Sequence, residues 1–234
     1  EKAAEMEIHS FADLKAALGV VHRVPHHYLM SLGGEAKRDY PASIGHQSPW
    51  YTELGYLEDH FARLNTALTR GRPVVDIAVI HPVESYWVHW GPSESTGSIR
   101  NQLEKNFSDI IEWLLFAQLD FDFISESLLP DQFGGVHDGR MRVGHMEYRA
   151  VVVPAPVTLR QTTVDALTEF EKAGGTVIFM GDCPEYVDAI RSDAVKPVFD
   201  AAERIPFSRD ALTGALEPFR RIEIRKDTGH LSGD

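Results

Sequence analysis

The stretch from residue 146 to residue 182 limits the fold more than any other part of the chain, because it combines a strand, a helix and a second strand. Residues 148–153 (YRAVVV) are too apolar for a strand with one solvent-exposed face, so we expect this strand to be buried on both faces. Residues 176–180 (TVIFM) have the same character. Strands joined through a helix run parallel with a right-handed crossover, so the sequence predicts an α/β fold with a parallel sheet.

The helix between these two strands is predicted over residues 158–173. Its apolar side chains recur at helical spacing and form one stripe: Val164, Leu167 and Phe170. The pair Gly174–Gly175 follows, and glycine readily adopts the left-handed conformation in which many helices end. The three elements are therefore predicted to form a βαβ unit.

Two more strands are predicted upstream, at residues 74–80 (VVDIAVI) and 121–125 (FDFIS). Between them, residues 99–119 have the pattern of a long amphipathic helix. We expect residues 126–147 to form an irregular connection and residues 218–225 (PFRRIEIR) to form a half-buried strand. The predicted sheet has four strands that all run the same way: 74–80, 121–125, 148–153 and 176–180.

The N-terminal part of the chain adds one predicted strand between two helices. A helix ends at Gly19, residues 20–30 (VVHRVPHHYLM) form a strand, residues 37–49 form a loop, and residues 50–69 form an amphipathic helix. One strand cannot make a sheet. It either joins the later sheet or is the last βα unit of a barrel whose earlier strands precede Glu1.

Charge and cysteine content exclude several classes of function. The chain has 23 basic and 35 acidic residues, a net charge of −12, which disfavours nucleic acid and anionic membrane as partners and favours a neutral or cationic ligand. The single cysteine, Cys183, excludes an internal disulfide and a Cys-rich zinc site. Because the sequence starts at Glu1 and not at Met, we expect a piece of a longer protein, whose localisation the sequence does not indicate.

Residues suited to sugar binding gather where the predicted strands end. Aromatic rings and hydrogen-bonding groups together are typical of sites that bind sugars. The candidate substrate-binding residues are His26, His27, Tyr28, Glu84, Tyr86, Trp87 and Asp182. Two alternatives stay open: the adjacent histidines can point to opposite sides of their strand, and Trp87 can pack on the top of the sheet.

The ordered set of motifs resembles one family of enzymes. HPVESYW at 81–87, VPAP at 153–156 and AGGTVIF at 173–179 look like parts of the domain that follows the catalytic barrel in glycoside hydrolase family 42 β-galactosidases. That domain is similar in fold to class I glutamine amidotransferases. Upstream, residues 24–41 and 49–68 look like the eighth strand and helix of the barrel in large glycoside hydrolases.

The resemblance implies a division of the chain into three parts. Residues 1–72 would be the last βα unit of a barrel-like region, residues 73–208 a flavodoxin-like or amidotransferase-like α/β domain, and residues 209–234 the start of a following β segment. The fragment would support the barrel, help to bind a carbohydrate substrate or contribute to a homo-oligomer. Its partners would be that substrate and the remainder of the parent chain.

The resemblance also implies that the catalytic residues lie elsewhere, because in those families the catalytic carboxylates are on earlier barrel strands. Glycosidic hydrolysis needs two carboxyl groups on either side of one bond. The carboxylates predicted near strand ends lack a context that marks such a pair: Glu35, Asp39, Glu84, Glu126 and Asp182. We therefore assign no catalytic residue and expect no glycosidase turnover from this chain alone.

Other chemistries are disfavoured by local sequence. Cys183 is followed by Pro184 and Glu185, where a nucleophile elbow needs small residues, so catalytic thiol chemistry is not expected. The histidines lack metal-ligand spacing, so no metal and no cofactor are expected. The alternative function is a self-contained flavodoxin-like module that binds a small ligand without hydrolysis. It requires residues 20–30 to lie in the same sheet as residues 74–80.

Overall fold

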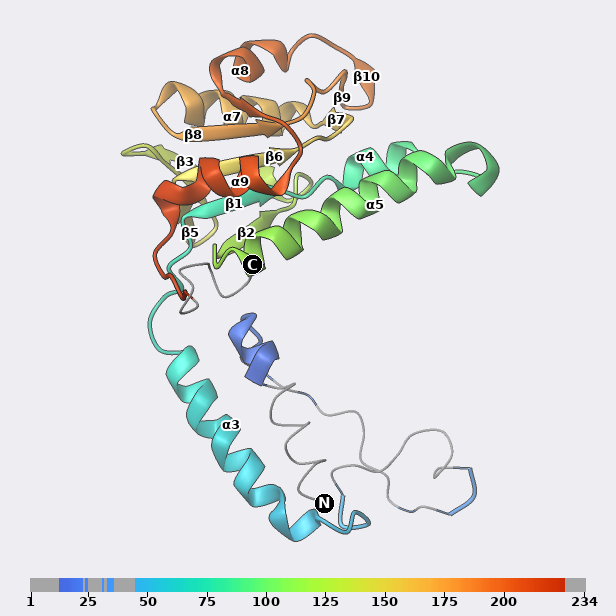
Figure 1. Ribbon diagram of the computed structural model, residues 1–234, viewed down its shortest axis with the longest axis vertical. Coiled ribbons are helices and arrows are strands. Elements are labelled where there is room, and N and C mark those ends of the chain that lie inside the picture. Colours follow the sequence, from blue (N-terminus) through green and yellow to red (C-terminus); the bar gives the residue numbers. More distant parts are fainter. Residues whose placement is uncertain (1–12, 23, 25–30, 32, 36–44, 226–234) are drawn as a thin grey trace. The chain divides into compact units, whose positions relative to one another are not determined.

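The computed structural model describes residues 13–22, 24, 31, 33–35 and 45–225 (Figure 1). The chain divides into two compact units, residues 1–73 and residues 74–234. Most of the strand predicted at 20–30 lies outside the described residues, together with His26, His27 and Tyr28. No helix in the described part of the chain is long and apolar enough to cross a membrane.

In the first unit the predicted helix at 50–69 is confirmed. A short 3-10 helix, η1 (Tyr51–Glu53), leads into α3 (Leu54–Leu68). Phe61 is buried, and the neighbouring His60 Nε2 lies 2.8 Å from Asp13 Oδ1, which ties a helical turn at 13–17 to α3.

The second unit is organised around a five-stranded parallel sheet, which confirms the predicted α/β fold. Its strands in spatial order are β2 (Phe121–Ile124), β1 (Ile77–Ile80), β6 (Ala150–Pro154), β8 (Thr176–Met180) and β11 (Glu203–Ile205). Numbered along the chain, this order is 2-1-3-4-5, which defines a flavodoxin-like sheet. The order reverses between β1 and β6, so the loops after these two strands diverge.

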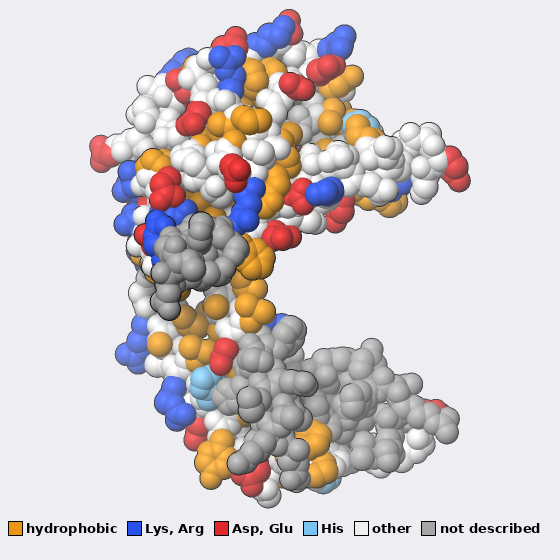
Figure 2. All heavy atoms as spheres, in the orientation of Figure 1, with side chains coloured by type: hydrophobic (Ala, Val, Ile, Leu, Met, Phe, Trp, Pro, Cys, Tyr) orange, Lys and Arg blue, Asp and Glu red, His pale blue; other side chains and the backbone are white. Residues whose placement is uncertain are grey.

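Helices cover both faces of this sheet (Figure 1). They are α5 (Ser93–Phe116), α6 (Leu129–Gln132), α7 (Gln161–Lys172), α8 (Lys196–Ala201), α9 (Arg209–Leu216) and the 3-10 helix η2 (Glu217–Phe219), whereas α4 (Val83–Val88) packs beside α5 and β7. Helix α5 starts earlier than the predicted residue 99, because its first turns are polar and show no apolar period. Lys, Arg, Asp and Glu side chains are interspersed on the face of the unit that Figure 2 presents.

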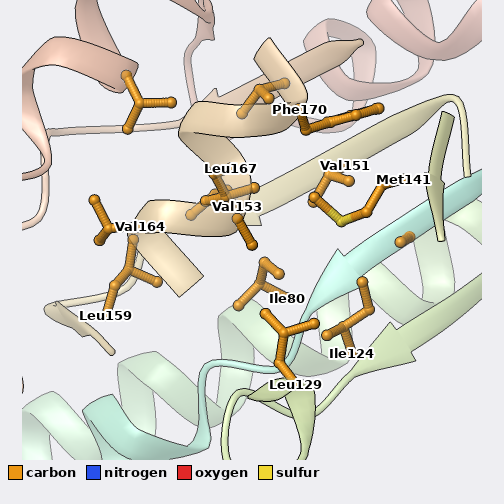
Figure 3. Packing of buried hydrophobic residues seen from close by; sticks show 14 of the residues in the cluster. Ile80, Ile124, Leu129, Met141, Val151, Val153, Leu159, Val164, Leu167 and Phe170 are labelled. Carbon is orange, nitrogen blue, oxygen red and sulfur yellow. The ribbon is translucent and has the colours of Figure 1, made fainter. Parts of the chain in front are cut away.

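Alternate residues of the central strands enter two separate cores. In β6, Val151 and Val153 pack with the apolar face of α7, whereas Ala150 and Val152 pack with α5 and α9. All four residues are fully buried, as expected for a parallel strand with helices on both faces. Figure 3 shows the first core, in which Leu167 of α7 lies close to Val153.

Residues 126–147 are not the irregular connection that we predicted. After α6 they form an antiparallel sheet of β3 (Phe133–His137), β4 (Arg140–Val143) and β5 (Met146–Tyr148). The strands are short, so their period is hard to see, but Asp138–Gly139 is a turn signal that could have revealed the hairpin. Both residues have positive φ, as a two-residue type I′ turn requires.

Three further segments differ from the prediction. Residues 83–88, predicted as loop, form α4. The half-buried strand predicted at 218–225 is wrong: η2 occupies its start, and Ile222 and Ile224 are 68% and 59% exposed. The residues from 209 onward, expected to begin a β segment, form α9, whose Leu212 and Leu216 belong to the sheet's second core.

Three short strands lie outside the main sheet. Strands β7 (Thr158–Leu159), β9 (Tyr186–Val187) and β10 (Ile190–Arg191) form a small separate sheet.

A buried carboxylate, Asp76, lies just before β1. It accepts a 2.6 Å hydrogen bond from Arg221 Nε and lies within 4 Å of two further guanidinium groups, which anchors residues after η2 to the main sheet.

The predicted glycine cap at the end of α7 is confirmed. Gly174 has φ +84°, its N–H donates to the carbonyl of Glu171, and the Gly175 N–H donates to the carbonyl of Phe170. These two bonds form a Schellman motif. A Cβ added to Gly175 would lie 2.0 Å from the ring of the fully buried Phe170, so close packing favours glycine over any larger residue at this position.

We predict that Gly175→Ala lowers the free energy of unfolding by about 1–3 kcal/mol, because the new methyl group overpacks the core against the Phe170 ring. In a Phe170→Ala background the same substitution should cost much less, since the obstructing ring is gone. Urea unfolding of the two single variants and the double variant measures this coupling. Equal costs in both backgrounds would show that Phe170 does not restrict residue 175.

Candidate active site at the strand-order reversal

A cavity of about 290 Å³ lies where the strand order reverses. Its lining comes from α4 after β1, from β7 and the residue after it, and from the turn between β9 and β10. The lining residues are Glu84, Trp87, Val88, Thr158, Leu159, Arg160, Asp188 and Ala189. We call this space the switch-point cavity. In open α/β sheets the carboxyl ends of strands at such a reversal are the usual place for a ligand.

Ser85 joins the two loops that diverge at this point. Its side chain is fully buried, and its Oγ accepts hydrogen bonds from the N–H groups of Val157 (2.9 Å) and Thr158 (3.2 Å). The same hydroxyl lies 3.2 Å from the Thr158 carbonyl oxygen, to which it donates. One serine therefore holds the start of α4 against the chain that follows β6, and it fixes one wall of the cavity.

Arg160 connects two buried carboxylates. Its guanidinium Nε donates to Glu84 Oε1 over 2.9 Å, and its backbone N–H donates to Glu126 Oε2 over 2.7 Å. Glu84 is 8% exposed and Glu126 is fully buried. The second oxygens, Glu84 Oε2 and Glu126 Oε1, are buried and have no hydrogen-bond partner within the described part of the chain.

The protonation of Glu126 is shifted by its surroundings. Burial raises the pKa of Glu126 from 4.5 to about 7, and the negative charge of Glu84 acts in the same direction. The hydrogen bond from the Arg160 N–H opposes this shift. Glu126 therefore exchanges its proton near neutral pH. It does not line the switch-point cavity, so it affects the site through its hydrogen bond with the Arg160 N–H and its charge interaction with Glu84.

The aromatic residues after β1 divide into two groups. Trp87 lines the cavity and is 57% exposed, so its ring is available to a ligand. Tyr86 and Trp90 instead flank the guanidinium of Arg100, which lies 5.1 Å from the Trp90 ring centroid and 6.0 Å from that of Tyr86. Among the predicted binding residues in the described ranges, Glu84 and Trp87 thus meet at the cavity, whereas Tyr86 and the exposed Asp182 do not line it.

Cys183 lines a different cavity of about 510 Å³. Burial raises the pKa of its thiol, with a further contribution from the charge of Asp200, so the reactive thiolate is disfavoured at neutral pH. The residues that the structure describes contain no group of three or more His, Cys, Asp or Glu side chains placed to hold a metal ion.

The fold and the cavity define a flavodoxin-like α/β unit with a cavity at its strand-order reversal. No family model and no curated protein matches the chain. Solved structures that resemble it include the family 42 β-galactosidase Gan42B (16% identity, TM-score 0.42), covering 65% of this chain and 20% of that one. The β-galactosidase from Rahnella sp. R3 gives 16% identity and a TM-score of 0.44, covering 67% and 22%.

A third similar structure is the apo family 42 exo-carrageenase from Bacteroides ovatus, with 14% identity and a TM-score of 0.42. The match covers 75% of this chain and 22% of that protein. The chain therefore spans about a fifth of the length of each of these three proteins.

We predict that Glu126 makes the stability of the protein fall as the pH rises from about 4.5 to 7. In this range the folded state keeps the proton on Glu126 while the unfolded state loses it, so folding is penalised increasingly, by up to about 3 kcal/mol above pH 7. Glu126→Gln keeps an acceptor for the Arg160 N–H and removes the titration. Urea unfolding between about pH 5 and pH 8 should show the variant gaining stability relative to the parent as the pH rises. Parallel curves would contradict the prediction.

Proposed function

We propose that this chain is part of a carbohydrate-active protein and that its α/β unit binds a small sugar in the switch-point cavity. The observation that carries the proposal is the exposed Trp87 ring beside Glu84, Arg160 and Asp188 at the strand-order reversal. The ordered motifs at 81–87, 153–156 and 173–179 support the carbohydrate-active context.

The composition of the cavity favours a sugar over a wholly apolar ligand. A sugar ring has apolar C–H faces that pack on an aromatic ring, and hydroxyl groups that need hydrogen-bond partners. Trp87 offers the first, and the charged side chains around it offer the second. A volume of about 290 Å³ is near the lower end for small-molecule sites, which favours one or two sugar rings.

We propose binding without hydrolysis for this unit. Glycosidic cleavage needs a protonated carboxyl group beside the scissile bond and a second carboxylate across from it. Among the residues that the structure describes, Glu126 is the carboxyl group whose pKa is raised to about 7, and it lies outside the cavity lining. The catalytic carboxylates of the parent protein would then lie in another part of its chain.

A second candidate is an architectural role, favoured by apolar side chains at one edge of the sheet. β2 is an edge strand, and Phe123 on it is 39% exposed. Phe116 at the end of α5 and Leu128 just beyond β2 are each 51% exposed. In this case the β2 edge would pack against the remainder of the parent chain or against a second copy.

Calorimetric titration with monosaccharides and disaccharides tests the first proposal. We expect Trp87→Ala to weaken binding by about tenfold or more, because the ring loses its packing against the sugar. The control is Trp90→Ala: Trp90 is 70% exposed and close in sequence, but it stacks on Arg100 and does not line the cavity. Trp90→Ala should leave the affinity unchanged.

Two results would contradict the proposal. Equal affinities for the parent and Trp87→Ala would place sugar binding elsewhere on the chain. An absence of binding to any tested sugar would favour the architectural role.

A further inference from the structure

The switch-point cavity has an unbalanced charge. Three charged side chains line it: Glu84, Arg160 and Asp188. The Arg160 guanidinium donates directly to Glu84, so these two charges compensate each other. Asp188 is exposed, and its Oδ1 accepts the N–H of Gln161 at 3.3 Å. The lining therefore carries one net negative charge, which favours a positively charged ligand over an anionic one.

Glu84 adds a second reason for a donor-rich ligand. The residue is 8% exposed, it lines the cavity, and its buried Oε2 has no hydrogen-bond partner in the described part of the chain. A buried carboxylate oxygen without a partner is unfavourable, and a positively charged donor in the cavity beside Glu84 offsets part of that cost through its charge. An ammonium group offers three donors and no acceptor, so it suits a wall made of carboxylates better than a hydroxyl does.

Trp87 is compatible with the same ligand. The face of an indole ring attracts a cation through its quadrupole, in addition to packing against apolar groups. Trp87 and Val88 both line the cavity, and both are about half exposed. Glu126, which accepts the Arg160 N–H, adds negative charge near the cavity when it is ionised and is uncharged when it is protonated.

We propose that the switch-point cavity takes an amino sugar, with its ammonium group beside Glu84 and Asp188 and its ring on Trp87. This inference rests on the proposed sugar-binding function and names the class of sugar. A neutral sugar would gain no charge–charge attraction from Asp188, and an anionic sugar would be repelled by Asp188. The overall net charge of −12 acts in the same direction.

The test is calorimetric titration of the full chain with glucosamine and galactosamine at about pH 6, where the amines are protonated. Glucose and galactose serve as neutral counterparts of nearly the same shape, and the two N-acetylated sugars as neutral counterparts with a larger group on the same nitrogen. We expect each amino sugar to bind about tenfold or more tightly than its neutral counterparts. Its affinity should also fall with added salt, because the attraction between exposed charges is screened.

Asp188→Asn removes the charge and keeps the oxygen that accepts the Gln161 N–H. It should weaken amino-sugar binding several-fold and leave binding of neutral sugars unchanged. The matched control is Asp165→Asn, because Asp165 is also exposed and bonded to Gln161, through the side-chain Nε2, but does not line the cavity. That variant should leave the affinities for both kinds of sugar as they are.

The possible failures are distinguishable. Neutral sugars that bind as tightly as amino sugars would overturn this inference and leave the proposed function standing. A preference for amino sugars that survives Asp188→Asn would also overturn it, since the charge would then come from another site. If no sugar of either kind binds, the proposed function itself fails.

Discussion

Burial of β1 and β6 on both faces is the constraint on which the rest of the α/β unit depends. Their side chains enter two cores alternately, and each core needs its own layer of helices. Right-handed crossovers then place the chain on one side of the sheet before the reversal of strand order and on the other side after it. The loops after β1 and β6 must therefore part, and the switch-point cavity lies between them.

Polar contacts inside the unit determine the shape of that opening. The Ser85 hydroxyl holds the two loops together, and Arg160 is bonded to Glu84 through its side chain and to Glu126 through its backbone. With two buried carboxylates and one guanidinium, the cluster cannot be neutral unless one carboxylate holds a proton. These side chains thus stabilise the wall of the cavity, and the net negative charge of the lining comes from Asp188.

Long apolar runs and regular helical patterns in the sequence predicted the fold well. Very short strands and contacts between residues far apart in the sequence could not be predicted. The strand at 176–180 follows from a continuous apolar run, and the glycine cap of α7 from a local turn rule. The fifth strand, β11, has only three residues and two of them are exposed, so no period marks it. Of the site, Glu84 and Trp87 could be predicted because they follow a buried strand. Arg160 and Asp188 could not, because they meet Glu84 only through the fold, 76 positions away in the case of Arg160.

The central claim is that a ligand occupies the switch-point cavity, and the most direct measurement is an NMR titration of the isotope-labelled chain with galactosamine. The account predicts that the indole N–H signal of Trp87 and the backbone amide signals of Arg160 and Asp188 shift together with one dissociation constant. The indole signal of Trp113, which packs against Phe207 on the α5 and α9 side of the sheet, should stay in place. Shifts confined to the cavity around Cys183, with Trp87 unmoved, would contradict the account.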